Sequence, residues 1–376
     1  MNKPIVVGAL LGWLVSATAA TAQVHVEYVA HACFVVESPD GVRVIIDPFD
    51  SHRWLGYSFP DDVPADAVLV THPHYDHDAA HYWSLETPVF RKPGRYAIGD
   101  VRVEGVVGKH AEPYGKEFGQ LNTIWVVETG GIRIAHLGDN GPLDARTLSA
   151  LGRVDVLMLP VDGDDHILKR HESDAIRDAL QPRITVPMHY RLEPLSELPR
   201  SLGPIEPWLE GRSGVERLET NRVRIEAGTD DAIFVFPHSP SVRAWPPSLH
   251  EAWKLRGEAL DGAKSAGPSE ELLTKLDRAM GLAPGAVVFT YEWARMAKDL
   301  GHSDAARTRL ERTLASAGRD DRQYRMLARQ LFGDLLSAAG REREAAQQYR
   351  LVLDGAYLTR LREEAARALG GIEGGR

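Results

Sequence analysis

The 376-residue chain has a single cysteine, Cys33, so no disulfide can form within it even in an oxidising compartment. It also lacks any block of Lys and Arg, and its formal net charge is −9. Proteins that bind nucleic-acid backbones carry basic surfaces, so no nucleic-acid partner is expected. The 43% apolar and 26% charged content is otherwise ordinary for a globular protein, and the length is enough for two domains.

A run of hydrophobic residues long enough to span a membrane is also missing near the N-terminus. The apolar segment Ile5 to Val15 is short and rich in Gly and Ala. It follows Lys3 and precedes an A-x-A cleavage pattern at Ala20 to Ala22, which predicts a secretory signal peptide. We therefore expect cleavage before Gln23 and a periplasmic or secreted protein with no stable membrane span. An uncleaved anchor is the alternative, and the absence of a Cys after the cleavage site argues against a lipoprotein.

Histidine, in contrast, is concentrated in the stretch Thr71 to His77, which reads T-H-P-H-Y-D-H. The apolar run Ala67 to Val70 just before it predicts a buried strand, and Pro73 places the histidines on a loop at the end of that strand. His72 and His74 can face one way in extended backbone, while the Asp-His pair that follows stands where a helix could start. So many imidazole and carboxylate groups around one turn predict a zinc-type metal site.

Three more motifs follow at domain-scale spacing: G-K-H ending at His110, H-L-G-D ending at Asp139, and P-M-H-Y ending at Tyr190. In this order the set resembles the metallo-β-lactamase superfamily over residues 24 to 236. It is most similar to the branch that contains ascorbate-phosphate lactonase and other zinc-dependent hydrolases. The resemblance implies an α/β fold of the αββα type, in which two sheets lie between helices.

The motif order and the resemblance imply two divalent metal ions per chain. The expected ligands are His72, His74 and His110 for one ion, Asp76, His77 and His189 for the other, and Asp139 as a bridge. Zinc suits this histidine-rich set, with manganese and iron as alternatives.

Other residues near these motifs are candidates for catalytic or supporting roles. Asp76 could also orient the attacking hydroxide or protonate the leaving group. His31 and Tyr190 are further catalytic candidates, with structural roles as the alternative. Asp47 closes an apolar strand and is expected to fix the tautomer of a ligand, against the alternative of a turn-initiating Asp. Cys33 lies in a strand-like run and is expected to be a buried structural thiol.

Two loops could line the mouth of the site. The segment 51–62 is rich in aromatic residues, which suits either a substrate wall or a packed surface loop. The acidic segment from Asp162 to His166 departs from the resembling family, and either lines the mouth or is a solvated loop.

The β pattern nearly disappears after Phe236, and a Pro-rich stretch follows. We expect the domains 1–22 (signal peptide), 23–238 (hydrolase), 239–266 (linker) and 267–376 (all-α helical repeats). The motif L-G-H-S-D-A-A at residue 300 has a counterpart 39 residues later, A-G-R-E-R-E-A-A at 339, and both mark a turn between helices. Such pairs resemble tetratricopeptide repeats, although the usual spacing there is about 34 residues. An ordinary helical bundle is the alternative.

The resulting functional hypothesis is a dinuclear metal-dependent hydrolase. A metal-bound hydroxide would attack an ester, lactone or amide carbonyl of a small, anionic molecule. The alternatives are a phosphodiesterase with the same site, a β-lactamase, and a secreted scaffold that acts through its helices. The helical region is expected to bind a protein partner or to dimerise. Because every expected ligand precedes Pro237, its removal is expected to lower hydrolysis by less than about tenfold.

Overall fold

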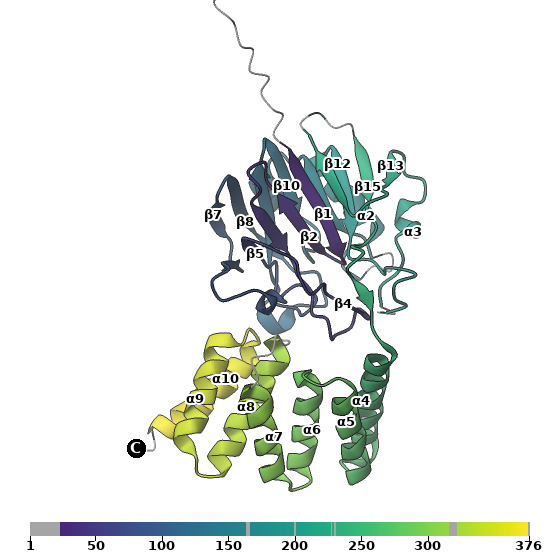
Figure 1. The fold of residues 1–376 in the computed structure, drawn as a ribbon. Helices are drawn as coiled ribbons and strands as arrows, with labels where there is room; N and C mark the ends of the chain where they lie inside the picture. The colour runs from purple at the N-terminus through teal and green to yellow at the C-terminus, as the bar shows by residue number, and fades with distance from the viewer. Residues whose placement is uncertain are drawn as a thin grey trace, which may run out of the picture.

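The computed structural model describes residues 23–162, 166–198, 201–226, 228, 231–315 and 322–374. These residues form an α/β sandwich and an all-α region that lies against one end of the sandwich (Figure 1). The expected fold class, an α/β domain followed by a helical domain, is confirmed. The predicted signal peptide lies outside the described residues, as do Asp164 and Asp165 of the acidic segment.

The first sheet has the strand order β14-β1-β2-β3-β5-β6. Its strands are β1 (Val24–Ala30), β2 (Cys33–Glu37), β3 (Arg43–Ile46), β5 (Ala67–Leu69), β6 (Val89–Phe90) and β14 (Arg222–Ile225). Strands β1 to β3 pair antiparallel, whereas β5 pairs with β3 in parallel. Because parallel strands end at the same edge of a sheet, Asp47 after β3 emerges beside the histidine-rich loop after β5.

The second sheet has the order β13-β15-β12-β11-β10-β9-β8-β7. Its strands are β7 (Gly94–Ile98), β8 (Val101–Lys109), β9 (Leu121–Thr129), β10 (Ile132–His136), β11 (Val156–Pro160), β12 (Ile184–Met188), β13 (Val215–Arg217) and β15 (Ala232–Val235). Strands β10, β11 and β12 are parallel and are connected through helices α1 (Ala145–Leu151) and α2 (Arg170–Leu180). Their carboxyl ends therefore deliver Asp139, Asp162 and His189 to one edge, where loops of α/β folds bind ligands.

Shorter elements complete the sandwich: β4 (Tyr57–Ser58), η1 (Ala80–Tyr82), η2 (Lys116–Phe118), α3 (Glu206–Leu209) and β16 (Arg243–Ala244). The α-helix expected to start near Asp76 is only the 3-10 helix η1. The apolar faces of the two sheets form one hydrophobic core, in which Trp125, Tyr28 and Phe34 are among the largest fully buried side chains. Cys33 is fully buried in this core, as predicted.

The helical region packs around a second, separate hydrophobic core. Its helices are α4 (Pro247–Ala266), α5 (Glu270–Leu282), α6 (Val287–Asp299), α7 (Ser303–Ala315), α8 (Arg322–Ala338), α9 (Glu342–Gly355) and α10 (Thr359–Gly374). Helices α4 and α5, α6 and α7, and α8 and α9 pack as pairs, and each pair contacts the next (Figure 1). None of the helices in the described ranges has the length and apolar content needed to cross a lipid bilayer.

The expected linker 239–266 is wrong over most of its length, because helix α4 occupies residues 247–266. Proline is well tolerated at the first helical position, where its missing N–H would have no partner in the helix. Pro247 therefore starts the helix. Leu249, Ala252, Leu255 and Ala259 then follow at helical spacing and are buried in the second core.

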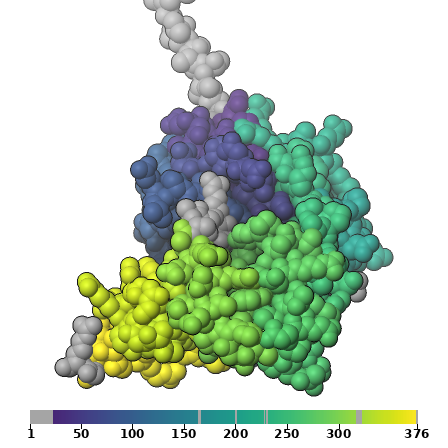
Figure 2. All heavy atoms as spheres, turned by 60° about the horizontal axis from the view of Figure 1, so that its bottom comes forward, coloured from purple at the N-terminus to yellow at the C-terminus, as the bar shows by residue number. Residues whose placement is uncertain are grey.

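Two tryptophans, one just before helix α4 and one within it, fasten the helical domain to the sandwich, and Figure 2 shows the two domains packed closely together. The indole N–H of Trp245 donates to the carbonyl of Ser51 at 2.7 Å, and that of Trp253 donates to the carbonyl of His52 at 2.8 Å. The two indole rings stack with their centroids 6.1 Å apart. The aromatic segment 51–62 is thereby held between the two domains.

Candidate metal centre

The loop from Thr71 to Asp78, here called the metal loop, is organised from outside by Asp47. The carboxylate of Asp47 accepts the backbone N–H of Thr71 at 2.8 Å and the hydroxyl of Thr71 at 2.7 Å. It also accepts a hydrogen bond from Nδ1 of His77 at 2.7 Å, since a carboxylate can only accept there. Asp47 thus fixes the tautomer of His77, one of the residues expected to bind a metal.

Three more histidines have one ring nitrogen fixed by a neighbour in the same way. Because the Thr71 hydroxyl donates to Asp47, its oxygen accepts from His72 Nδ1 at 3.0 Å. His110 Nδ1 donates to the carbonyl of Ala111 at 2.9 Å. His74 Nε2 donates to Glu117 Oε1 at 3.0 Å. Each of these three rings therefore has its second nitrogen available to bind a metal.

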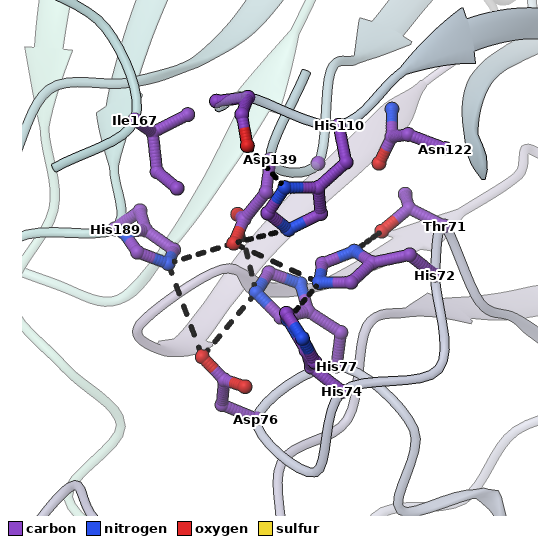
Figure 3. A network of polar contacts seen from close by, with 12 residues as sticks. Thr71, His72, His74, Asp76, His77, His110, Asn122, Asp139, Ile167 and His189 are labelled. Carbon is purple, nitrogen blue, oxygen red and sulfur yellow. Dashed lines mark hydrogen bonds and ion pairs between the residues drawn. The ribbon is translucent and has the colours of Figure 1, made fainter. Parts of the chain in front are cut away.

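Ring nitrogens of four histidines surround the carboxylate of Asp139, as Figure 3 shows. Asp139 Oδ2 lies 3.7 Å from His72 Nε2, 3.6 Å from His110 Nε2 and 3.3 Å from His189 Nε2. Asp139 Oδ1 lies 3.2 Å from His77 Nε2. A tetrahedral zinc ion with bonds of about 2.0–2.2 Å keeps its ligand atoms roughly 3.3–3.6 Å apart, so these separations suit metal coordination.

The donors fall into two main groups whose ligand atoms lie within 4.8 Å of one another. One group is His72, His74, His110 and Asp139, and the other is His31, Asp76, His77 and His189. All seven residues predicted as ligands are therefore brought together, and they divide as the sequence indicated. His31 joins the second group, where its Nε2 lies 3.2 Å from Asp76 Oδ2.

Several buried polar atoms of the centre lack hydrogen-bond partners, which indicates a site for cations. Within the described part of the chain, His77 Nε2, His110 Nε2, His189 Nε2 and Asp139 Oδ1 are buried and have no hydrogen-bond partner. Buried polar atoms are rarely left unpaired, so several of them facing one point call for an ion. His72 Nε2 and His74 Nδ1 lie 3.1 Å apart, close enough for one ion to contact both.

The charges of the site act strongly on each other. Burial alone would lower the pKa of His77, but Asp139, Asp76 and Asp47 outweigh it and hold that pKa well above its usual value. Burial would raise the pKa of Asp139, but His189 and His77 hold it well below its usual range. For His72, burial and the neighbouring His77 hold the pKa well below 6.5. Positive charge at His77 is therefore stabilised by the carboxylates around it, whereas His72 is held as a neutral ring.

Backbone strain is concentrated at the same place. His31, Asp47, Trp54 and His189 all have φ between 49° and 60°, the left-handed region that non-glycine residues rarely adopt. Residues in such strained conformations cluster at functional sites, where the surrounding structure holds the backbone in place. The left-handed turns after strands β1, β3 and β12 direct the side chains of His31, Asp47 and His189 towards the centre.

In the H-L-G-D motif the histidine bonds to the backbone, and the aspartate is the residue that faces the other donors. His136 is buried, its Nε2 donates to the carbonyl of Ala32 at 2.8 Å, and its Nδ1 accepts from the N–H of Gly138 at 3.1 Å. Gly138 has φ 55°, and a Cβ there would lie 2.5 Å from the hydroxyl oxygen of Thr71. His136 is thus a structural residue, and Gly138 allows the backbone close enough for Asp139 to reach the metal loop.

The structure separates the two remaining catalytic candidates. His31 lies in the centre, with its ring centroid 4.2 Å from that of His189. Tyr190 instead packs in the hydrophobic core, where burial raises the pKa of its hydroxyl and Tyr28 is its hydrogen-bond partner. A buried phenol with a raised pKa, bonded to another phenol, is not suited to proton transfer at neutral pH, so the catalytic role expected for Tyr190 is not supported.

Aromatic side chains surround the centre. Trp54 packs beside His189 and His166, with ring centroids 6.3 Å and 5.8 Å away, and Tyr114 packs on His166 at 4.5 Å. Phe118 contacts His74 with centroids 5.0 Å apart. Only part of the aromatic segment 51–62 can form the expected substrate wall. Its Tyr57 and Phe59 do not contribute, because they are buried against Phe49 in the core.

The acidic segment has a structural carboxylate at its start. Asp162 is fully buried and accepts the N–H groups of His166 and Ile167 at 2.8 Å and 2.7 Å. These bonds turn the chain so that His166 stacks on His189, with centroids 5.8 Å apart. Ile167 points towards the centre in Figure 3.

Sequence reasoning missed two carboxylates of the site. Glu117 orients His74 from helix η2, but nothing in the sequence near it indicates a partner. Asp78 directly follows the ligand His77, so its place in the run D-H-D was a usable signal. It is buried and accepts two hydrogen bonds from Arg91, at 2.8 Å and 2.7 Å.

Comparisons with known proteins found relatives of the sandwich domain. A β-lactamase superfamily domain matches residues 25–189. A UPF0173 metal-dependent hydrolase of Archaeoglobus fulgidus is 28% identical over 200 residues, which is 46% of this chain and 85% of that protein. A UPF0173 protein of Pyrococcus furiosus is 30% identical over 192 residues, covering 43% of this chain and 80% of the relative.

Solved structures are similar to each part of the chain. A metallo-β-lactamase superfamily protein from Thermotoga maritima is 26% identical with a TM-score of 0.45, covering 57% of this chain and 98% of its own. The tetratricopeptide-repeat domain of Arabidopsis OM64 is 14% identical with a TM-score of 0.30, covering 34% of this chain and 99% of that domain. From its sandwich domain and its relatives, the chain belongs to the metallo-β-lactamase superfamily and is a metal-dependent hydrolase.

Proposed function

We propose that this hydrolase is dinuclear and that it cleaves a small ester, lactone or amide. The observation that carries the proposal is the position of Asp139 between two groups of donors. Its carboxylate lies 3.6 Å from His110 Nε2 of one group and 3.2 Å from His77 Nε2 of the other. A carboxylate with two oxygens can serve a cation on each side, so His72, His74 and His110 would hold one ion and Asp76, His77 and His189 the other.

Two divalent cations, zinc by the donor set, would act as Lewis acids and would lower the pKa of water towards about 7. Their positive charge would lie where an oxyanion develops when a carbonyl is attacked. The carboxylates of Asp76 and Asp139 would face the cations directly, and those of Asp47 and Glu117 would balance them from behind His77 and His74.

The chain's own residues orient the reactants. His31 Nε2 donates to Asp76 Oδ2 at 3.2 Å, which fixes the carboxylate that would orient the attacking water. Trp54, His166 and Phe118 form aromatic walls that would cover the apolar part of a small molecule and exclude water from it. The motif order resembles the branch that contains ascorbate-phosphate lactonase, so lactones are the first substrates to try.

The test combines metal analysis with a substrate panel. Protein purified without chelators should carry about two metal ions per chain, and it should hydrolyse chromogenic esters or lactones faster than bis(nitrophenyl) phosphate. Faster cleavage of the phosphodiester would replace the carbonyl proposal with the phosphodiesterase alternative. Protein without any bound transition metal would contradict the dinuclear site.

A ligand variant and a matched histidine variant sharpen the test. His72→Ala should lose metal and hydrolysis while the fold survives, because the sandwich has its own hydrophobic core. His136→Ala should instead lower the melting temperature, because both ring nitrogens of His136 bond to the backbone. If His72→Ala keeps its metal and its turnover, His72 is not a ligand.

A further inference from the structure

One end of the metal loop is anchored by the helical domain. Asp78 follows the ligand His77, and its side chain is only 1% exposed. Its Oδ2 accepts a hydrogen bond from Nη1 of Arg322, the first residue of helix α8, at 2.7 Å. The backbone N–H of Asp78 donates to the carbonyl of His74 at 2.8 Å, so Asp78 is connected directly to two of the expected ligands.

The two residues after Arg322 reach the same region of the sandwich. Gln323 Oε1 accepts from Arg53 Nη1 at 3.2 Å. The guanidinium of Arg53 lies between two rings, 3.7 Å from the centroid of Tyr75 in the metal loop and 4.7 Å from that of Tyr324. The whole first turn of helix α8 is therefore docked beside the ligands.

Arg322 is itself held in place by the helical domain. Its Nε donates to the carbonyl of Gly355 at the end of helix α9 at 2.8 Å, so the guanidinium joins α8, α9 and the metal loop. Nearby, Tyr357 donates to Gln323 Oε1 at 3.2 Å, and its ring centroid lies 6.3 Å from that of Phe118 beside the histidines. Figure 1 shows this end of α8 and α10 directly against the sandwich.

The metal loop needs such anchors because it contains no helix or strand. Its start is fixed by Asp47 through Thr71, within the sandwich. Its end is fixed at Asp78, where one set of donors comes from Arg91 and another from Arg322. A buried carboxylate that loses a charged hydrogen-bond donor is destabilised unless it moves to reach another donor. Such a movement would also shift the ligands beside it.

We propose that Arg322 is a positioning residue for the metal centre, so that the helical domain holds Asp76 and His77 in their ligand geometry through Asp78. The proposal rests on the dinuclear site proposed above. It changes the expectation from the sequence alone, in which the helical region works independently of the hydrolase domain.

The experiment measures zinc binding by the full-length protein in competition with a chromogenic chelator. The variants are Arg322→Ala and Arg322→Lys, with Arg341→Ala as a matched control. Like Arg322, Arg341 binds a carboxylate, in its case through two contacts at 2.7 Å and 2.6 Å, but its partner Glu344 lies within the helical domain. The melting temperature of each metal-free variant and the visible spectrum of its cobalt form complete the measurements.

Arg322→Ala should weaken zinc binding about 2- to 30-fold, the range of coupling effects carried through a contact network. It should alter the cobalt spectrum, while the metal-free melting temperature stays close to that of the parent. Arg322→Lys should recover part of the affinity, because it keeps the positive charge, and Arg341→Ala should bind zinc normally. In an Asp78→Asn background, Arg322→Ala should cause no further loss, since the two side chains act through one contact.

The outcomes separate this inference from the proposed function. Normal zinc affinity and an unchanged cobalt spectrum in Arg322→Ala would overturn the positioning role while leaving the dinuclear site intact. Additive losses in the double variant would also overturn it. If Arg322→Ala does not fold, Arg322→Lys decides, and an unchanged spectrum there counts against the proposal. A parent protein that binds no zinc contradicts the proposed function itself.

Discussion

At the scale of single residues, Asp47 organises a metal centre without belonging to the proposed ligands. One of its oxygens accepts from both His77 and Thr71, and Thr71 in turn accepts from His72. The tautomers of one ligand in each donor group are therefore set by one fully buried carboxylate. A change at Asp47 can therefore disturb both groups at once.

We predict that Asp47→Asn weakens zinc binding about 10- to 100-fold, as expected for a partner that orients metal ligands. An amide keeps the shape of the side chain but replaces one acceptor oxygen by a donor, so it cannot accept all three hydrogen bonds. Competition with a chelator measures the change. Asp155→Asn is the control, because Asp155 is a buried aspartate that accepts the N–H of Arg133 far from the metal loop. If both variants bind zinc as tightly as the parent, Asp47 is only a turn residue.

Histidines show what a sequence can and cannot reveal about single residues. The pattern H-x-H-x-D-H was predictable as a metal loop because ligands two and three residues apart must lie together. His136 and His31 each stand alone in the sequence, and one is structural while the other faces the donors. The difference depends on a backbone carbonyl 104 residues away in one case and on a left-handed turn in the other, and neither leaves a local pattern.

At the scale of elements, the strand predicted at Ala67 to Val70 is present as β5, whereas the linker predicted across helix α4 is wrong. Strands such as β1 alternate buried and half-buried residues, so their sequence shows the period of two. At α4, neighbouring prolines suggested a linker, although proline is also common where helices begin. The prolines at the start of helix α4 therefore obscured the helix itself, and they also obscured the contact that joins the two domains.

The first sheet offers a test of how charge stabilises a set of strands. Glu37 on β2 accepts from Arg43 Nη1 on β3 at 2.5 Å and from Arg222 Nη2 on β14 at 2.8 Å. Burial would raise the pKa of Glu37, but Arg222 and Arg43 outweigh it and lower the pKa from 4.5. A lowered folded-state pKa means that the carboxylate stabilises the fold above pH 4.5 and loses this effect as the pH falls through the folded-state value.

We therefore predict that Glu37→Gln lowers the free energy of unfolding at pH 7 by about 1 kcal/mol or less, the range for partly exposed ion pairs. The difference from the parent should shrink as the pH falls below 4.5, where the carboxylate of the parent is progressively protonated. Urea unfolding at pH 7 and in mild acid measures both values. The exposed Glu219 is the control, and Glu219→Gln should show neither effect. A difference that grows in acid would reverse the assigned sign.

At the scale of the whole molecule, we predict export and cleavage before Gln23. The prediction rests on Lys3, the apolar segment after it and the A-x-A pattern at residues 20–22. Mass spectrometry of the protein recovered from the periplasm or the medium should give Gln23 as the first residue. A protein that keeps residues 1–22 and stays in the cytoplasm would contradict this.

The relation between the two domains is the part of the molecule that the sequence could not predict. Each hydrophobic core has its own periodic pattern, so two domains were expected. Their contact, however, depends on single side chains, such as Trp253 on His52 and Arg322 on Asp78. These pairs are 201 and 244 residues apart in the sequence, and no periodicity connects them.

The last prediction concerns removal of the helical domain, residues 247–376. The sandwich should still fold, because its hydrophobic core is separate from that of the helices, and far-UV circular dichroism can verify this. The truncated protein loses Arg322 from Asp78 and Trp253 from the segment that carries Trp54. We therefore expect zinc affinity to fall at least as far as in Arg322→Ala, and ester or lactone hydrolysis to fall more than about tenfold, or ~1.4 kcal/mol on the barrier. A folded truncation with parental zinc affinity and turnover would show that the helices serve only another partner, as the sequence alone suggested.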